Sequence, residues 1–444
     1  MARYNNRNRN RSPVEFEAEI VGLSHDGRGV ARIDGKAVFV SGALLGETVR
    51  AQISGRTRHF DEANLLEVQV ASPHRVTPRC AHFAQCSGCV LQHLADPEQI
   101  AAKHEVLFDN LQRIGHVKPE TVLEPLRDAA WGYRRKGRLS VRYVEKKGRT
   151  VVGFREDNPR FVADLGECHT MIPAVADRLP ALSALMDTLE GKRNIPQIEF
   201  IAGDERVALV FRHLEPLSDA DRACLLTFAQ QYGLCVLLQP GGVDSVHPLW
   251  PADVALSYAI PAYDLRIAFQ PLDFIQVNAG LNRKMIDHAL QLLSPQREER
   301  ILDLFCGLGN FTLPLARKAG TVVGVEGDAG LVARARDNAR QNGIDNAEFH
   351  AADLARDLTA EPWMHGGFDK LLLDPPRAGA AQVLEQLPLN GISRIVYVSC
   401  HPGSLARDAG FLVRERGFVL KAAGAMDMFP HTAHVESIAV FDAR

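Results

Sequence analysis

The chain has 444 residues, of which 46% are hydrophobic and 24% charged, and its formal net charge is −3. This length is too great for one hydrophobic core, so we expect two to four domains. No apolar run approaches the roughly 20 residues that span a bilayer, and the polar start of the chain does not resemble a secretory signal. We therefore expect a cytoplasmic protein without a membrane partner. Eight cysteines are too few for a disulfide scaffold in a chain of this length, which favours metal binding or catalysis for some of them.

The chain begins with a basic, asparagine-rich segment. It contains four arginines before the first acidic residue, Glu15, namely Arg3, Arg7, Arg9 and Arg11. Such a composition is typical of a disordered tail that can reach phosphate groups. We expect residues 1–12 to form this tail.

Residues 13–71 contain short alternating segments separated by glycine turns. Hydrophobic and polar residues alternate in "GKAVFV" and "TVRAQI", and the dipeptides Asp26-Gly27 and Asp34-Gly35 favour hairpin turns. The pattern predicts a small β-barrel. This segment resembles a TRAM domain, an OB-like RNA-binding barrel that is attached to RNA-modifying enzymes.

Residues 72–270 predict a mixed α+β central domain, with a helix from about Asp96 to Gln112. Within it, the stretch from Trp131 to Arg149 holds eight Lys or Arg residues and one Glu, with aromatic residues between them. Cations and aromatic faces together suit unstacked RNA bases. A solvated pair of strands explains the same composition, and charge alone does not decide between the two.

Three cysteines lie within ten residues of one another in a turn-rich stretch with the spacing C-x5-C-x2-C, and a fourth lies in "DLGECHT". These are Cys80, Cys86, Cys89 and Cys168. Structural zinc usually takes two closely spaced pairs of ligands, whereas three thiolates in one loop and one distant thiolate favour an iron–sulfur cluster. The neighbouring histidines His82, His93 and His169 leave zinc as the alternative.

From about residue 300 strand-like and helix-like segments alternate regularly. This rhythm predicts a parallel sheet with helices on both faces, as in a Rossmann-like α/β domain, here residues 271–444. The last two strand-like segments, "FVLKAAGAMDMF" and "VESIAVF", follow each other without a helix, which favours an antiparallel hairpin at the end of the sheet.

The first strand of this series leads into a glycine-containing turn, "LDLFCGLGNFTLPLA". Gly307 and Gly309 allow a tight turn before a helix that begins near Phe311. A dinucleotide fingerprint requires a third glycine, where this chain has Thr312, and Asp303 would repel a pyrophosphate. Glu326 ends the next strand and is placed to accept the hydroxyls of a ribose. The set resembles a class I S-adenosylmethionine-dependent methyltransferase rather than an NAD site.

A cysteine and a glutamate identify the methyl acceptor. Cys400 ends the fifth strand-like segment, and Glu436 follows "MFPHTAHV" near the end of the chain. Carbon 5 of uracil is not nucleophilic enough to attack a sulfonium until a thiolate adds to carbon 6, and a base must then remove the proton on carbon 5. These two side chains fit those two roles. Cys306, Cys224 and Cys235 are expected to be packing residues.

The motifs "DLFCGLGNFTLPLA", "LLLDPPRAG", "VYVSCHPGSLARD" and "DMFPHTAHVES" resemble the RNA uracil-5-methyltransferase family over most of the last 175 residues. The resemblance implies that Cys400 is the nucleophile and Glu436 the base. It implies methyl-donor contacts at Gln276, Phe305, Asn310, Glu326, Asp353 and Asp374. Together with the TRAM-like barrel, these motifs make the chain similar to the branch of the family that methylates uridine 1939 of 23S ribosomal RNA. Similarity to this branch implies a [4Fe-4S] cluster on Cys80, Cys86, Cys89 and Cys168.

We therefore predict a monomeric methyltransferase that binds 23S ribosomal RNA and no protein partner. Three alternatives remain: the same chemistry on another ribosomal uridine or on transfer RNA, a non-catalytic RNA-binding or assembly factor, and a redox protein that uses the cluster.

Overall fold

A computed structural model describes residues 14–444, so the predicted basic tail lies outside the described residues. The chain forms two compact units. The first comprises the residues up to Pro78 together with Cys89–Ala102 and His431–Ala433, and the second comprises Arg79–Gly88, Lys103–Pro430 and His434–Arg444. None of the helices within residues 14–444 is both long and apolar enough to cross a bilayer.

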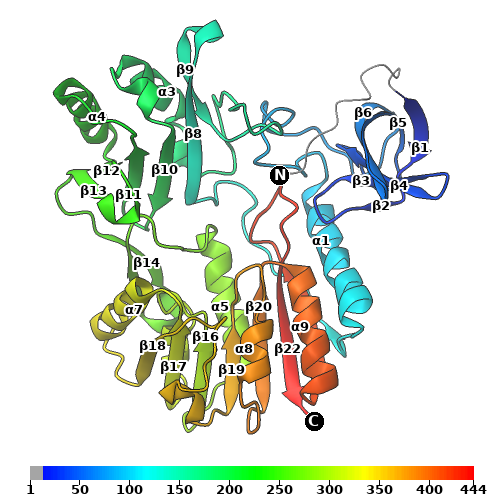
Figure 1. The fold of residues 1–444 in the computed structure, drawn as a ribbon, viewed down its shortest axis with the longest axis vertical. Helices are drawn as coiled ribbons and strands as arrows, with labels where there is room; N and C mark the ends of the chain where they lie inside the picture. The colour runs from blue at the N-terminus through cyan, green and yellow to red at the C-terminus, as the bar shows by residue number, and fades with distance from the viewer. Residues whose placement is uncertain (1–13) are drawn as a thin grey trace. The chain divides into compact units, whose positions relative to one another are not determined.

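The first unit contains a six-stranded sheet that coils around a small apolar core (Figure 1). Its strands are β1 (Glu15–Glu19), β2 (Gly22–Leu23), β3 (Gly29–Ile33), β4 (Lys36–Ser41), β5 (Thr48–Arg56) and β6 (Phe60–Val70), in the order β1-β5-β6-β4-β3-β2. Asp34 (φ 50°) and Gly35 (φ 81°) are both left-handed, as the two-residue turn between β3 and β4 requires. The predicted hairpin at Asp34-Gly35 is thereby confirmed.

The second unit includes the last part of α1 (Asp96–Asn110) and contains a mixed six-stranded sheet. The strands are β8 (Lys136–Val144), β9 (Arg149–Gly153), β10 (Gln197–Ala202), β11 (Val207–Arg212), β12 (Cys235–Gln239) and β13 (His247–Trp250), in the order β13-β12-β11-β10-β8-β9. Three helices accompany them, α2 (Pro173–Ala176), α3 (Leu179–Thr188) and α4 (Asp219–Tyr232). Residues of α3, α4 and the sheet form one buried apolar cluster.

The basic, aromatic stretch of this unit forms the antiparallel strands β8 and β9. Two of its tyrosines contact other residues of the protein. Tyr133 is 6% exposed and its hydroxyl donates to the Pro430 carbonyl at 3.0 Å, while the guanidinium of Arg193 lies 4.1 Å from the centre of the Tyr143 ring. The suggestion that these aromatic faces stack on RNA bases is therefore wrong for Tyr133, which is buried, and a pair of strands forms as in the alternative. For Tyr143 the suggestion stays a prediction.

The last part of the chain forms an eight-stranded sheet. Its strands are β7 (Thr121–Val122), β16 (Arg300–Leu304), β17 (Thr321–Glu326), β18 (Ala347–Ala351), β19 (Lys370–Leu373), β20 (Arg394–Ser399), β21 (Phe418–Met426) and β22 (Glu436–Ala443), in the order β18-β17-β16-β19-β20-β22-β21-β7. The five strands from β18 to β20 are parallel, whereas β22 is antiparallel to both of its neighbours. This confirms the predicted parallel sheet and its antiparallel end.

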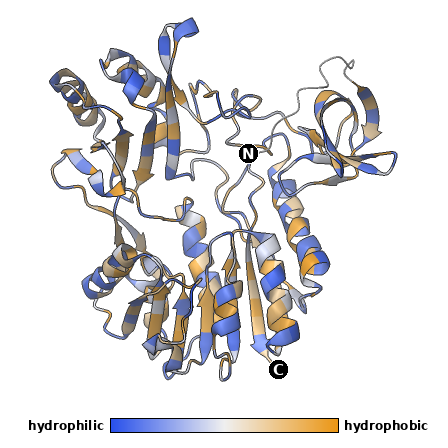
Figure 2. Cartoon of the chain, in the orientation of Figure 1, coloured by the Kyte–Doolittle hydropathy of each residue, from blue (hydrophilic) through white to orange (hydrophobic). Residues whose placement is uncertain are grey.

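Helices alternate with these strands and pack on the sheet (Figure 1). They are α5 (Ala279–Leu293), α6 (Thr312–Ala316), α7 (Ala329–Gln341), α8 (Ala381–Gln386) and α9 (Pro402–Glu415). Figure 2 shows that β19, β20 and β22 are mainly hydrophobic, whereas α9 carries residues of both kinds. The buried residues of α9 include Leu405, Ala409 and Leu412, which recur at helical spacing on the side that packs on the sheet.

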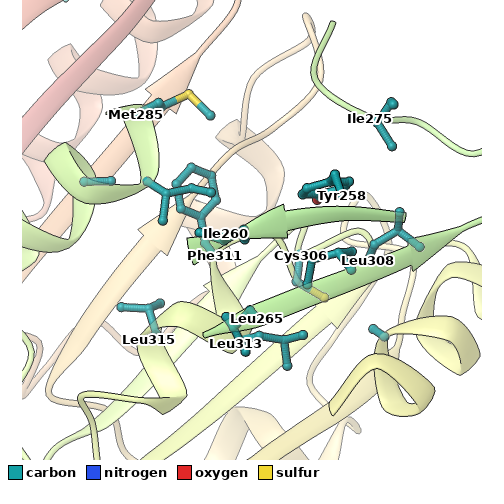
Figure 3. Close-up of a cluster of buried hydrophobic side chains, with 14 of the residues drawn as sticks. Tyr258, Ile260, Leu265, Ile275, Met285, Cys306, Leu308, Phe311, Leu313 and Leu315 are labelled. Atoms are coloured by element: carbon teal, nitrogen blue, oxygen red, sulfur yellow. The ribbon is translucent and has the colours of Figure 1, made fainter. Parts of the chain in front are cut away.

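A two-stranded hairpin, β14 (Leu256–Ile260) and β15 (Leu265–Phe269), adds to the core of the methyltransferase sheet. Figure 3 shows part of this cluster, in which Tyr258, Ile260 and Leu265 of the hairpin accompany Leu308 and Phe311 from the turn after β16. The hairpin therefore connects the central sheet to the segment that holds the predicted donor site.

Asp408 of α9 holds the loop that follows β19. It is 1% exposed, and its Oδ2 accepts hydrogen bonds from the Tyr397 hydroxyl at 2.7 Å and the Ala380 amide at 2.8 Å. Its Oδ1 accepts from Arg407 Nε at 2.8 Å. The loop carries the sequence that follows Asp374, so this carboxylate orders one side of the predicted site.

Asp408→Ala should lower the free energy of unfolding by about 3 kcal/mol, because it leaves a buried hydroxyl and a buried amide without their acceptor. Urea unfolding followed by circular dichroism measures this change. Asp337→Ala, which removes a half-exposed carboxylate paired with Arg340 on α7, is the matched control and should change the unfolding midpoint little. An Asp408→Ala midpoint equal to the wild-type value would contradict the assigned role.

Candidate active site

The ends of three parallel strands bring three predicted donor contacts together. Leu304 of β16 pairs with Val325 of β17 on one side and with Leu373 of β19 on the other. The residues that follow Leu304, Val325 and Leu373 therefore lie at the same height along the sheet. These next residues are Phe305, Glu326 and Asp374, which lie at the carboxyl edge of the sheet, where open α/β sheets bind their ligands.

The two predicted catalytic residues reach the same edge from opposite chain directions. Ser399 of β20 pairs with Ser437 of β22, and the Ser437 hydroxyl donates to the Ser399 carbonyl at 3.1 Å. Because the strands are antiparallel, Cys400 follows the end of β20 where Glu436 begins β22. The structure therefore places the thiol and the carboxyl group at adjacent positions, beside the end of β19 that carries Asp374.

The turn after β16 has an unusual backbone. Phe305 has a φ of 64°, and Gly307 and Gly309 have φ values of 56° and 89°. A left-handed phenylalanine is strained by about 1–3 kcal/mol, and such strain is commonly found at ligand sites. The expected helix begins at Thr312 and is only five residues long, so the turn itself, rather than a long helix, shapes this part of the site.

Glu326 is held by backbone amides. Its Oε2 accepts from the Gly307 amide at 3.1 Å, and its Oε1 accepts from the amides of Gly327 at 2.7 Å and Asp328 at 3.1 Å. Both lone pairs of Oε1 are therefore engaged, whereas Oε2 retains one that can accept a further hydrogen bond. The arrangement fits a contact with a ribose hydroxyl, because it fixes the carboxylate at the strand end before a ligand arrives.

Asn310 has a side chain with three hydrogen bonds. Its Oδ1 accepts from the Tyr258 hydroxyl at 2.9 Å and from Asn282 Nδ2 at 3.0 Å, and its Nδ2 donates to Asn282 Oδ1 at 3.0 Å. Gln276 lies in the segment before α5, and its carbonyl accepts from Arg135 Nε at 2.9 Å. Sequence reasoning did not identify Arg135, Tyr258 or Asn282, since no local pattern signals that they meet in space.

Asp353 is the most exposed of the predicted donor contacts, with 55% of its side chain exposed. Its Oδ1 accepts from the Ala355 amide at 3.1 Å, and its Oδ2 lies 2.9 Å from Arg356 Nε. It follows β18 by two residues, on the strand farthest from Cys400 in the parallel part of the sheet.

Burial opposes ionisation of the acids at this edge. Desolvation raises the pKa of Asp303 to about 8, with smaller contributions from the charges of Asp374 and Glu326, although the Thr312 hydroxyl donates to its Oδ2 at 2.5 Å. Desolvation also raises the pKa of Asp374 to about 7. The pKa of Glu436 is raised well above its usual range by desolvation and by Asp374. Neutral and charged forms of Asp303 and Asp374 are therefore close in free energy near neutral pH, whereas the buried Glu436 favours its neutral form.

Cys400 is half-buried, and its thiol is harder to ionise than a free cysteine. Burial is the largest cause, and the charges of Glu436 and Asp374 add to it, so that the pKa of Cys400 is raised to about 11. The nearby guanidinium of Arg377 acts in the opposite direction. The site therefore holds Cys400 as a thiol until a cation or a proton acceptor favours the thiolate.

The rival cysteine of this region lies in the apolar core. Cys306 is 4% exposed, burial raises its pKa well above the usual range, and it belongs to the cluster drawn in Figure 3. Cys235 is also buried, and Cys224 packs against the central core. These three positions fit packing roles.

Lys103 supports the segment that leads to Glu436, and sequence reasoning missed it. It is 2% exposed, and its Nζ lies 2.7 Å from Asp427 Oδ1 and 2.9 Å from the Phe429 carbonyl. A buried cation paired in this way fixes the chain that leaves β21 toward Glu436.

Three of the four predicted cluster cysteines belong to the second compact unit, and Cys89 belongs to the first. Burial raises the pKa of Cys80, and the charge of Cys168 adds to this effect, so Cys168 lies near Cys80. Cys86 Sγ accepts from the Gly88 amide at 3.4 Å. Within residues 14–444 no group of three or more His, Cys, Asp or Glu side chains is gathered closely enough to hold a metal ion. The thiol chemistry of these residues fits an iron–sulfur cluster, and the cluster stays a prediction.

Comparison with known proteins agrees with the architecture. The family described as TRAM domain matches residues 14–66, and the family described as tRNA (Uracil-5-)-methyltransferase matches residues 259–444. The tRNA (uracil-54, C5)-methyltransferase of Pyrococcus abyssi, solved in complex with S-adenosyl-L-homocysteine, superposes with a TM-score of 0.73 at 24% identity over 96% of this chain and 100% of that one. This structure shows the same fold.

The sequence relatives are much closer. The 23S rRNA (uracil(1939)-C(5))-methyltransferase RlmD of Xanthomonas euvesicatoria is 64% identical over 100% of both chains. The protein of the same name from Xanthomonas campestris is 65% identical over 99% of this chain and 100% of its own length. With this similarity over its whole length, the chain belongs to the family of 23S rRNA (uracil(1939)-C(5))-methyltransferases.

Proposed function

We propose that this protein transfers a methyl group from S-adenosylmethionine to carbon 5 of uridine 1939 in 23S ribosomal RNA. Family membership over the full length supports the donor and the RNA. The observation that carries the chemistry is the adjacency of Cys400 and Glu436 at the sheet edge that also holds Phe305, Glu326 and Asp374. Because the substrate is ribosomal RNA, we place the activity in the cytoplasm.

The reaction begins with addition of the Cys400 thiolate to carbon 6 of the uracil. A sulfur–carbon bond forms, and the electrons of the 5,6 double bond move onto the carbonyl oxygen as an enolate. Carbon 5 then attacks the methyl group, and the bond from methyl to the donor's sulfur breaks to leave the neutral thioether. Glu436 removes the proton on carbon 5, and elimination of Cys400 restores the double bond.

The charge state of the site suits this sequence of steps. Before ligands bind, burial favours neutral Cys400, Asp374 and Glu436. The positive sulfonium of the donor, together with Arg377, favours their ionised forms. The nucleophile and the base therefore become active when the donor is in place.

RNA binding requires that the target base leave its stack, because carbon 6 is shielded there. The TRAM-type sheet of the first unit supports RNA binding by this chain. Exposed cations of the β8–β9 hairpin provide a second surface for phosphates. They are Arg138, Arg142, Lys146, Lys147 and Arg149.

We also propose that Cys80, Cys86, Cys89 and Cys168 bind a [4Fe-4S] cluster. The number of thiols supports it, as does the proximity of Cys80 and Cys168 across more than eighty residues of sequence. Its role would be to join the loop at residues 80–89 to the segment around Cys168. None of the steps above uses it.

Methyl transfer to unmodified 23S ribosomal RNA is the direct test. Incubation with S-adenosylmethionine carrying a labelled methyl group should label uridine 1939, as mapped by mass spectrometry of RNA fragments. Labelling of another ribosomal uridine or of transfer RNA would select the first alternative, and transfer RNA is a necessary comparison because residues 259–444 match a family named for it. If no RNA is methylated, the remaining alternative is a non-catalytic RNA-binding or assembly factor.

Two variants separate the catalytic steps in the same assay. Cys400→Ala should lower methyl transfer by at least about a thousandfold without weakening donor binding, because no enolate forms. Glu436→Gln should accumulate a covalent adduct between protein and methylated RNA, visible on a denaturing gel, because the carbon 5 proton stays in place. Unchanged turnover of Cys400→Ala would remove the proposed mechanism.

The reactivity of Cys400 toward iodoacetamide should depend on pH in a defined direction. Since the pKa of this thiol is raised, its alkylation should rise about tenfold per pH unit from pH 7 to 9 without reaching a plateau. Glu436→Gln should speed alkylation most at the highest pH, where more of Glu436 is ionised, because it removes a negative charge that opposes the thiolate. Mass spectrometry of the peptide that contains Cys400 measures the rate, and Glu348→Gln is the control. A plateau below pH 8 would show a thiol that is already activated.

Anaerobically purified protein should contain about four iron and four sulfide ions per chain. Cys80→Ala and Cys168→Ala should abolish the iron content, whereas Cys224→Ala, which changes a thiol packed against the central core, should retain it. Iron and sulfide analysis gives the answer. Zinc in place of iron would favour the alternative zinc site. Protein that contains neither iron nor zinc would contradict a metal site at these cysteines.

A further inference from the structure

The hydroxyl group of Tyr258 is a buried polar group that the proposed reaction does not use. Tyr258 lies on β14 and is 4% exposed. Figure 3 shows its ring among apolar residues of the core. A buried hydroxyl requires a partner, and here the partner is Asn310 Oδ1 at 2.9 Å.

The ring of Tyr258 has little freedom to move. The guanidinium of Arg135 lies 4.7 Å from the centre of the Tyr258 ring. The centre of the Phe269 ring, on β15, lies 6.1 Å from the same point. Arg135 is itself 4% exposed and donates to the Gln276 carbonyl. One buried cation therefore connects Tyr258 to the segment that carries Gln276.

The orientation of the Asn310 amide depends on this hydroxyl. Asn282 and Asn310 exchange two hydrogen bonds of 3.0 Å, and a reciprocal pair of amides does not by itself set which group of Asn310 faces outward. The Tyr258 hydroxyl donates to Oδ1, so that Oδ1 has two donors. Within the described residues Nδ2 has only Asn282 as acceptor, which leaves one N–H of Asn310 for a ligand.

We propose that Tyr258 is a positioning residue of the methyl-donor site, whose hydrogen bond turns the Asn310 amide so that its N–H meets the carboxylate of the donor's amino-acid end. This inference rests on the proposed placement of Asn310 in the donor site. An N–H group forms a hydrogen bond with an acceptor such as the carboxylate of the methyl donor, but not with the ammonium group of the methyl donor, which has no acceptor atom. Tyr258 thus acts on the amino-acid end and not on the adenosine.

Two ligands distinguish this role from a general structural one. S-Adenosylhomocysteine contains adenosine, thioether and amino-acid end, whereas 5′-methylthioadenosine lacks the amino-acid end. Tyr258→Phe should weaken binding of S-adenosylhomocysteine by about five- to tenfold and leave binding of methylthioadenosine unchanged within about twofold, as measured by titration calorimetry. In turnover, KM for the methyl donor should rise by a similar factor, while kcat and KM for RNA stay constant.

The matched control is Tyr263→Phe on the same hairpin. The hydroxyl of Tyr263 interacts with Asp287 rather than with Asn310, so this variant should bind both ligands as the wild type does. In an Asn310→Ala background, Tyr258→Phe should have no further effect on S-adenosylhomocysteine binding, because the group that it orients is gone.

If the wild type binds S-adenosylhomocysteine and Tyr258→Phe binds it equally well, the role of Tyr258 is overturned but the proposed donor site is not. Equal weakening for both ligands would also overturn it, since that result indicates a general loss of packing. Failure of the wild type to bind S-adenosylhomocysteine would instead overturn the proposed donor site.

Discussion

Asp374, Glu436 and Cys400 share one edge of the sheet, where desolvation opposes the ionisation of all three. The charge of Asp374 further opposes ionisation of Glu436, and the charges of both acids oppose ionisation of Cys400. The rest of the site follows from this constraint. A thiolate and a carboxylate base cannot both persist in such surroundings without positive charge nearby. In the proposed reaction the cationic sulfonium of the methyl donor supplies that charge, so donor binding and ionisation of these groups favour each other.

The sheet topology makes this concentration of groups possible. Parallel strands bring Phe305, Glu326 and Asp374 to one edge, and the reversed direction of β22 brings Glu436 to the same edge from a later part of the chain. An ordinary parallel crossover would have placed the start of that strand at the opposite edge. The proposed chemistry therefore depends on the antiparallel end of the sheet, which also completes the fold.

Supporting residues hold the site from several directions. Asp408 fixes the loop after β19, Lys103 fixes the segment between β21 and β22, and the Tyr258 hydroxyl reaches Asn310 from the β14–β15 hairpin. Each of these is a buried polar group with a specific partner, so each resists displacement of the loop that it holds. The hairpin also shares its core with the central sheet, which explains why these parts form one compact unit.

The sequence alone determined the strand–helix rhythm after residue 300, the hairpin turn at Asp34-Gly35, and the catalytic and donor candidates, because these depend on local periodicity and on short motifs. It misjudged Tyr133, which is buried and whose hydroxyl donates to the Pro430 carbonyl. Only the tertiary structure decided the partners of Asn310, Asp427 and Asp408, and the pKa shifts at the sheet edge. The physical reason is that burial and hydrogen bonding arise between segments distant in sequence, as with Tyr258 and Asn310, which are 52 residues apart.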